Sequence, residues 1–366
     1  MDNSPQEDLV RRVLDGYDLG PLRRIEQHGG TAGRNWRIET TSGAWLLRTR
    51  GPRTSSDQAI AFDHALRRHL VSRRVPTAAP VPRRDGRTFT RLEERAYEVY
   101  PFISGFSCAA ASAAQVQSAA CGLAAFHRAG ATFPVARTAP PMVQYATLGI
   151  PDTSDRPEDP ALLAKAYDRL CAEAQTGRFV QSADCCRRWL SRLQDEFGSA
   201  TYNGLPHVLT HGDYTLANLL FDSRGELTGI FDFDWARWAP RVRDLADGTY
   251  FIGAVRRTKL NPGDIWSLTD ASDLSVERCV LWLRAYGETE SLAPEEIHVL
   301  PLAFAARWLS VRAEGTAKVP AEDRMQFCFR DLAAPLEWLE EHWGEVAATL
   351  GRPACRCGQG VPPRSA

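Results

Sequence analysis

One stretch of the chain carries the residue types that phosphoryl transfer needs. It reads His211-Gly-Asp213-Tyr-Thr-Leu-Ala-Asn218 and is followed fourteen residues later by Asp232. Transfer from a metal-bound nucleotide requires a base for the incoming hydroxyl and oxygen ligands for Mg²⁺. Asp213 and Asn218 stand five residues apart, the separation of the base and the metal-binding Asn in a kinase catalytic loop. The pattern therefore predicts Asp213 as base, with Asn218 and Asp232 as metal ligands.

A predicted β-hairpin would bring these groups together. Two apolar runs, 218–221 and 227–231, flank a short turn and would fold Asp232 back toward Asn218. The alternative is a turn whose polar side chains bond only their own backbone. Asp234 is predicted on the same strand face as Asp232. It could bind a second metal ion or cap the following turn, and both interpretations stay open.

His211 joins Asp213 in the candidate catalytic pair. We expect its ring to pack and to orient the loop more than to transfer a proton. A loose transition state asks only for modest deprotonation of the alcohol, which Asp213 can provide. Farther along, Asp244 is expected to cap the next helix or to tie down the catalytic loop.

The motif resembles the Brenner-type motif of the aminoglycoside phosphotransferase/choline kinase superfamily, in which His-Gly-Asp stands where protein kinases have His-Arg-Asp. The similarity runs from about Leu19 to Leu350. It implies an α+β, bilobal, protein-kinase-like fold that uses ATP and Mg²⁺, with GTP a possible donor. Three further segments resemble family features, namely the helix before the catalytic loop, the Asp-Leu-Ala helix start and the nucleotide-covering hairpin: Ala119–His127, Arg243–Ala246 and Gly29–Ile38.

The resemblance also implies residues that bind the nucleotide. The family usually has a Lys on the third strand to pair with the phosphates, but the three lysines of this chain all lie outside the small lobe. The matching residue is Arg48, which keeps the charge and adds a planar fork. The alternative is an ordinary arginine on the strand surface. Its acidic partner on the following helix would be Asp63.

The segment Tyr100–Gly105 resembles the family's interlobe hinge, where backbone groups read the adenine. In this register the Tyr100 carbonyl accepts a hydrogen bond and the Phe102 amide donates one. An ordinary strand end is the alternative. In the preceding Gly-rich turn, Gly30 and Asn35 are expected to cover the nucleotide.

Composition indicates an ordinary enzyme with a large core. The 366 residues are 44% apolar and 24% charged, and the net charge is −1. A nucleic-acid binder would show a basic excess. No apolar run approaches a membrane span, and the N-terminus lacks a signal-peptide core, so we expect a cytoplasmic protein without membrane contact. Nine cysteines, an odd count, predict reduced thiols.

The chain is predicted to divide near residue 100. Residues 1–100 form the nucleotide-binding lobe, 101–351 the catalytic and substrate-binding lobe, and 352–366 a disordered tail. A long loop over 138–160 is expected on the substrate side. The small lobe should hold helices at 5–15 and 56–71 and strands at 22–27, 35–41, 44–50, 88–90 and 97–102.

The predicted reaction is ATP-dependent phosphorylation of a hydroxyl on a small molecule. Several features resemble the homoserine-kinase-like branch of the superfamily, which implies a homoserine- or choline-like amino alcohol or a specialised metabolite. Polycationic aminoglycosides call for an acidic cleft, and this chain is nearly neutral. An antibiotic-inactivating phosphotransferase remains the alternative, followed by a nucleotide-binding module without turnover. The chain could be a monomer or a homodimer.

Overall fold

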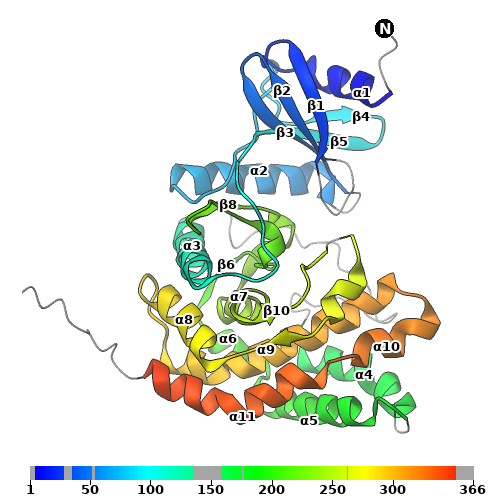
Figure 1. The fold of residues 1–366 in the computed structure, drawn as a ribbon, viewed down its shortest axis with the longest axis vertical. Helices are drawn as coiled ribbons and strands as arrows, with labels where there is room; N and C mark the ends of the chain where they lie inside the picture. The colour runs from blue at the N-terminus through cyan, green and yellow to red at the C-terminus, as the bar shows by residue number, and fades with distance from the viewer. Residues whose placement is uncertain are drawn as a thin grey trace, which may run out of the picture.

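Two lobes stack along the long axis of the protein (Figure 1). The structure is a computed structural model that describes residues 5–28, 35–51, 54–134, 158–174, 177–261 and 263–351. The N-terminal lobe is a small antiparallel sheet with helices, and the C-terminal lobe is larger and mainly helical. This arrangement confirms the expected α+β, bilobal fold class.

The small lobe is built on one five-stranded antiparallel sheet in the order β1-β2-β3-β5-β4. Its elements are α1 (Pro5–Leu14), β1 (Leu22–His28), β2 (Asn35–Thr40), β3 (Gly43–Thr49), α2 (Asp57–Ser72), β4 (Thr90–Leu92) and β5 (Arg95–Pro101). These bounds follow the predicted ones except at β4, which was expected at 88–90. Thr88 lies before the strand, where its hydroxyl is 2.6 Å from His64 Nδ1.

The two faces of this sheet have opposite character. Successive strand residues point to opposite faces, and on one face Ile38 and Leu47 pack with Val10 and Val13 of α1. The residues that alternate with these apolar ones, such as Arg48 after Leu47 on β3, point to the opposite face, toward α2 and the large lobe. The alternation of β3 therefore turns Arg48 into the space between the lobes.

The large lobe has nine α-helices within the described ranges, and they surround short hairpins. The helices are α3 (Ala113–Ala131), α4 (Pro160–Glu173), α5 (Val180–Glu196), α6 (Ser199–Gly204), α7 (Val242–Gly248), α8 (Val276–Gly287), α9 (Pro294–Gly315), α10 (Arg324–Phe329) and α11 (Ala333–Leu350). The strands pair two by two: β6 (His207–Thr210) with β9 (Arg237–Pro240), β7 (Leu219–Phe221) with β8 (Leu227–Ile230), and β10 (Val255–Arg256) with β11 (Ser272–Asp273). Short helical turns complete the lobe: η3 (Leu216–Asn218), η4 (Phe233–Trp235), the π-helical η5 (Thr249–Gly253), η6 (Ile265–Thr269), η7 (Thr316–Lys318) and η8 (Ala321–Asp323).

Helix α3 supports the hairpins that carry the catalytic motif. It begins with a capping box between Ser112 and Gln115. Its small residues allow close approach, because a Cβ at Gly130 would lie 2.9 Å from Leu209 Cβ of β6. At Gly122 a Cβ would collide with Leu227 of β8. The Ala- and Gly-rich run thus lets the helix lie directly on both strands.

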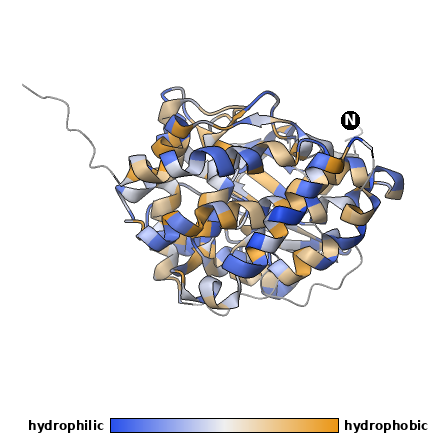
Figure 2. Ribbon diagram, turned by 90° about the horizontal axis from the view of Figure 1, so that it is seen from below, coloured by the Kyte–Doolittle hydropathy of each residue, from blue (hydrophilic) through white to orange (hydrophobic). Residues whose placement is uncertain are grey.

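The outer helices cover the core of the large lobe. Seen from below, their ribbons carry hydrophilic and hydrophobic residues mixed along each helix (Figure 2), the pattern of amphipathic helices. Among the described helices, none combines the length and apolarity needed to cross a bilayer. All seven cysteines within the described ranges are free thiols.

Two expected segments fall largely outside the described residues. Of the predicted loop at 138–160, the structure describes only the end, where Asp159 caps α4 by accepting from the Ala161 amide at 2.9 Å. Pro160 is already the first helical residue. The predicted tail at 352–366 is not among the described residues.

Candidate active site

The predicted catalytic loop, residues 211–218, lies between β6 and β7. Asn218 at its end contacts Asp213 near its start. Asn218 Nδ2 donates to the Asp213 carbonyl at 2.9 Å and to Asp213 Oδ2 at 2.8 Å. The amide of Phe231 donates to the Asn218 carbonyl at 3.0 Å, so the following residue, Asp232, lies next to Asn218. The predicted hairpin is confirmed as β7–β8. It brings the three residues of the motif together.

His211 is enclosed by the protein. Its side chain is fully buried, and its ring packs against Phe126 and Phe233. Nε2 lies 2.9 Å from the Phe231 carbonyl and must donate to it, while Nδ1 accepts from the Asp213 amide at 3.3 Å. Burial lowers the pKa of His211, although the charges of Asp244 and Asp213 oppose the shift. Both ring nitrogens are therefore occupied in orienting the loop.

Asp244 ties the loop to α3. Its carboxylate accepts from the amides of His211 at 2.6 Å and Gly212 at 2.8 Å. The same carboxylate pairs with His127 Nε2 at 3.0 Å, and His127 Nδ1 contacts Tyr286 Oη at 2.8 Å. Burial opposes the charge of Asp244, but the hydrogen bond and charge of His127 outweigh it and lower the pKa to about 2. Of the two roles expected for Asp244, the structure shows the tie to the loop.

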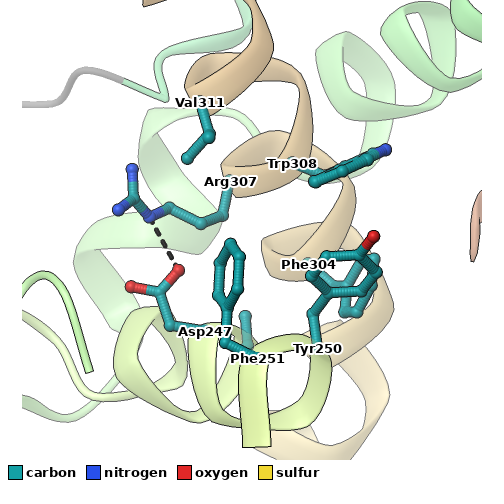
Figure 3. Close-up of a pocket in the computed structure, with 8 residues that line it drawn as sticks. Asp247, Tyr250, Phe251, Phe304, Arg307, Trp308 and Val311 are labelled. Atoms are coloured by element: carbon teal, nitrogen blue, oxygen red, sulfur yellow. Dashed lines mark hydrogen bonds and ion pairs between the residues drawn. The ribbon is translucent and has the colours of Figure 1, made fainter. Parts of the chain in front are cut away.

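A second tie, which the sequence did not reveal, comes from α9. Arg307 Nη2 donates to the Gly212 carbonyl at 3.2 Å, and its Nε donates to Asp247 Oδ1 at 2.8 Å (Figure 3). The available signal was a single arginine in the apolar helical run 300–309. Only the packing of α9 against α7 reveals its partners.

Asp232 has an unusual backbone and an enclosed oxygen. Its φ of 62° and ψ of 67° are left-handed, which is uncommon for a residue other than glycine. Strand β8 ends at Ile230, and Asp234 lies in η4. The predicted shared strand face of Asp232 and Asp234 was therefore wrong, because the left-handed residue ends the strand.

The electrostatic setting of Asp232 suits a bound cation. Its Oδ1 is buried and has no hydrogen-bond partner among the described residues, although about a third of the side chain, 33%, is exposed. Burial, with the nearby charge of Asp234, raises the pKa of Asp232 to about 7, and Arg48 opposes the shift. Asn218 presents its amide nitrogen to Asp213, which leaves its oxygen available. These two oxygen donors fit Mg²⁺.

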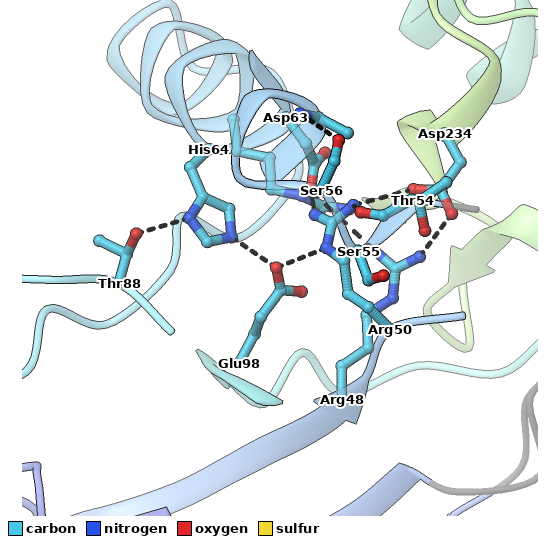
Figure 4. Close-up of polar contacts among 12 residues, drawn as sticks. Arg48, Arg50, Thr54, Ser55, Ser56, Asp63, His64, Thr88, Glu98 and Asp234 are labelled. Atoms are coloured by element: carbon cyan, nitrogen blue, oxygen red, sulfur yellow. Dashed lines mark hydrogen bonds and ion pairs between the residues drawn. The ribbon is translucent and has the colours of Figure 1, made fainter. Parts of the chain in front are cut away.

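Arg48 reaches across from the small lobe toward Asp234 of the large lobe (Figure 4). Its Nη2 is 2.9 Å from Asp234 Oδ2 and 3.6 Å from Asp232 Oδ1. The side chain is only 17% exposed. Asp234, expected at a second metal or as a turn cap, instead pairs with Arg48 and lies 3.4 Å from Arg50 Nη1.

The predicted partner of Arg48 is held by other arginines. Arg48 Nη1 is 4.0 Å from Asp63, whose carboxylate accepts from Arg67 Nε at 2.9 Å and also pairs with Arg50. Arg50 Nε donates to Glu98 at 2.6 Å. Arg50 lies one residue past the end of β3 and pairs more closely with this carboxylate of α2 than Arg48 does. No pattern in the sequence singled out Arg50.

The hinge is shifted by one residue from the predicted register. The Phe102 amide already donates to the Ala44 carbonyl at 3.1 Å. Tyr100 stands opposite Leu46, two residues along the same antiparallel ladder, so its backbone also faces β3. The predicted adenine contacts of Tyr100 and Phe102 are therefore wrong.

The hinge groups that face away from β3 are the Pro101 carbonyl and the Ile103 amide. Among the described residues, the Ile103 amide has no acceptor. Asn35 begins β2 opposite His28, and the His28 ring lies 5.5 Å from the ring of Phe102 at the hinge. Gly30 lies outside the described residues.

This chain is similar in sequence and in fold to known phosphotransferases. Residues 24–263 match the phosphotransferase enzyme family. The homoserine kinase of Neisseria meningitidis serogroup B is 29% identical over 274 residues, covering 68% of this chain and 79% of that protein. Among solved structures, an aminoglycoside phosphotransferase from Alicyclobacillus acidocaldarius superimposes with a TM-score of 0.65 at 16% identity, covering 93% of this chain and 96% of that one. A microcompartment-associated aminopropanol kinase gives a TM-score of 0.59 at 16% identity, covering 93% and 98%. At such identities, the structural likeness shows the fold.

Proposed function

Because this chain belongs to the phosphotransferase enzyme family, a family of small-molecule kinases, we propose that it transfers the γ-phosphate of ATP to the hydroxyl of a small amino alcohol of the homoserine type. Similarity to homoserine kinase supports this substrate class. The nearly neutral charge of the chain also suits a small amino alcohol better than a polycation.

The meeting of Asp213, Asn218 and Asp232 carries the proposal. Asn218 holds Asp213 Oδ2 at 2.8 Å, which leaves Oδ1 to accept a hydrogen bond from the substrate hydroxyl. As the hydroxyl oxygen bonds to the γ-phosphorus, the bond from that phosphorus to the bridging oxygen of ADP breaks. The hydroxyl proton passes late to Asp213 Oδ1. His211 and Asp244 act as positioning residues, because they hold the backbone on either side of Gly212.

Asn218 and Asp232 are the residues that would hold Mg²⁺. When bound, the ion neutralises charge on the β- and γ-phosphate oxygens. Arg48 lies beside Asp232 and is the cation placed to pair with the phosphates. Asp234 then serves to hold Arg48 in the space between the lobes. We therefore assign Asp234 to positioning rather than to a second metal ion.

The hinge supports recognition of adenine. The Pro101 carbonyl can accept from the exocyclic amine of adenine, and the Ile103 amide can donate to the neighbouring ring nitrogen. Guanine presents the opposite pattern of donor and acceptor on this edge. The corrected register therefore favours ATP over GTP.

The test is a coupled assay of ADP release over a panel of acceptors. L-homoserine, choline, aminopropanol, spectinomycin and kanamycin are compared with a reaction that lacks acceptor, and phosphorus NMR identifies the product. We expect an amino alcohol to give the fastest release. Faster phosphorylation of an antibiotic would refute the substrate class. ATP binding without ADP release from any acceptor would indicate a nucleotide-binding module instead.

A further inference from the structure

A small cavity lies between α9 and the segment formed by α7 and η5 (Figure 3). Its volume is about 10 Å³, enough for one water-sized group. Four of its lining residues are aromatic, and its two charged residues are the Asp247–Arg307 pair. The π-helical turn η5 supplies part of this wall, and such turns are frequent at functional sites.

Asp247 brings an unsatisfied carboxylate oxygen to this cavity. The residue is 1% exposed. Its Oδ1 accepts from Arg307, but its buried Oδ2 has no hydrogen-bond partner among the described residues. Burial raises the pKa of Asp247 to about 7, even though Arg307 and Arg243 oppose the shift. A buried acceptor without a donor is costly, so a single arginine does not fully compensate this carboxylate.

The apolar wall of the cavity consists of aromatic rings. Tyr250 and Trp308 have ring centroids 4.5 Å apart, and Tyr250 and Phe304 have centroids 5.6 Å apart. Aromatic rings beside a carboxylate are the surroundings that organic ammonium groups prefer. A neutral alcohol would gain less than an ammonium group from Asp247 Oδ2, which has no hydrogen-bond partner among the described residues.

The cavity is coupled to the candidate base through Arg307. Its guanidinium joins Asp247 to the Gly212 carbonyl at 3.2 Å, and Gly212 directly precedes Asp213. The negative charge of Asp213 also contributes to raising the pKa of both Asp247 and Arg307. Asp247 is therefore linked through one guanidinium to the residue that precedes Asp213.

From this geometry we propose that the cavity is an ammonium subsite for the phosphoryl-acceptor substrate. The protonated amine of an amino alcohol donates to Asp247 Oδ2 against the aromatic wall, while its hydroxyl reaches Asp213. This inference rests on the proposed function and narrows it to acceptors with a free amine. Asp247 and Arg307 thus set substrate specificity in addition to anchoring the loop.

The test compares amines with their amine-free counterparts by direct binding. L-homoserine and γ-hydroxybutyrate form one pair, and aminopropanol and propanol form the other. Each is titrated calorimetrically into the full-length protein with a non-hydrolysable ATP analogue. A charge-assisted hydrogen bond to a buried carboxylate predicts a preference for the amine of roughly 10- to 100-fold.

Three variants separate recognition from folding. Asp247→Asn should lose the preference for amines, because the amide cannot supply the charge. Ala246→Val should lose it by filling the cavity, while the Asp247–Arg307 pair stays intact. Asp184→Asn, an exposed residue of α5, is the control that should leave the preference unchanged. Binding of the ATP analogue and the melting temperature are measured for each variant to confirm folding.

The pH dependence gives a second readout. The amine preference of wild type should grow as pH rises through about 7, where Asp247 ionises, and Asp247→Asn should show no such rise. The other charged groups that act on Asp247 come from α9, α7 and the catalytic loop: Arg307, Arg243, Asp244 and Asp213. None of these other groups is altered in Asp247→Asn.

The outcomes are distinct. Equal affinity for amines and amine-free alcohols in wild type overturns the inference, as does a preference that survives in both cavity variants. A wild type that binds neither amine also overturns it. The proposed function fails separately, when no acceptor of the wider panel raises ADP release.

Discussion

Replacing Arg48 by alanine tests the part of the site that departs most from a lysine-bearing kinase. Arg48 lies between the lobes with its Nη2 2.9 Å from Asp234, and both side chains are largely shielded, with exposures of 17% and 16%. If Arg48 pairs with the phosphates of ATP, Arg48→Ala should weaken ATP binding and turnover together. Adenosine lacks phosphates and should bind equally well to both proteins.

The size of the effect follows from the contacts that exchange. Truncating one partner of a buried charge pair costs about 2–5 kcal/mol. Arg48 gives up its contact with Asp234 when it turns to a phosphate, so part of the gain on binding ATP is offset. We therefore expect the lower end of the range, about 2 kcal/mol, or roughly a 30-fold loss of ATP affinity. Arg48→Lys should recover part of it, because lysine keeps the charge but not the fork.

The assay is calorimetric titration of wild type and both variants with ATP, ADP and adenosine in the presence of Mg²⁺. Asp234→Asn serves as the matched variant on the large lobe. If Asp234 only holds Arg48, this change should leave the Mg²⁺ requirement unchanged and ATP affinity equal or higher. Equal ATP affinity in wild type, Arg48→Ala and Arg48→Lys would refute the phosphate role. Arg48 would then be a contact between lobes.

Three further predictions concern the catalytic loop. Asp213→Ala should cut turnover by about 10²- to 10⁴-fold with ATP affinity nearly unchanged, as steady-state kinetics and calorimetry would show; near wild-type turnover would exclude Asp213 as the base. Asp232→Asn should raise the Mg²⁺ concentration needed for half-maximal activity and nearly abolish that activity; an unchanged magnesium titration would contradict its role as a ligand. Asp244 has a folded-state pKa of about 2, below its unfolded value of about 4, so the stability it contributes is present above about pH 4 and lost as pH falls toward 2. That contribution is about 2–3 kcal/mol, and urea midpoints of wild type and Asp244→Asn should therefore converge with acidification; a gap that stays constant with pH would contradict this linkage.

Local pattern was sufficient for the elements that short stretches of chain determine. The strand-like run at 44–50 predicted the strand that carries Arg48, and the apolar runs around the turn at 222–225 predicted the hairpin that returns Asp232 to Asn218. Both depend on interactions between residues close in sequence. The period of a strand and the residue types of a turn can be recognised in such short segments without knowledge of the rest of the fold.

Backbone register was harder to predict. The sequence shows that residues near Tyr100 end a strand, but not which of them face β3. The pairing of Phe102 with Ala44 settles that. A slip of one residue reverses the direction of every backbone group. The proposed adenine contacts are therefore those of Pro101 and Ile103 in place of Tyr100 and Phe102.

The amino-acid sequence by itself predicted the candidate reaction centre, since Asp213, Asn218 and Asp232 lie within one short segment whose spacing is typical of phosphoryl-transfer chemistry. Tertiary structure alone decided the partners of the charged residues. Arg48 pairs with Asp234, 186 residues away. Arg307 lies 60 residues beyond Asp247 in the sequence and joins it to the Gly212 carbonyl. A buried charge must be paired by whichever opposite charge packing brings near. That choice depends on how helices and lobes meet, which no local pattern records.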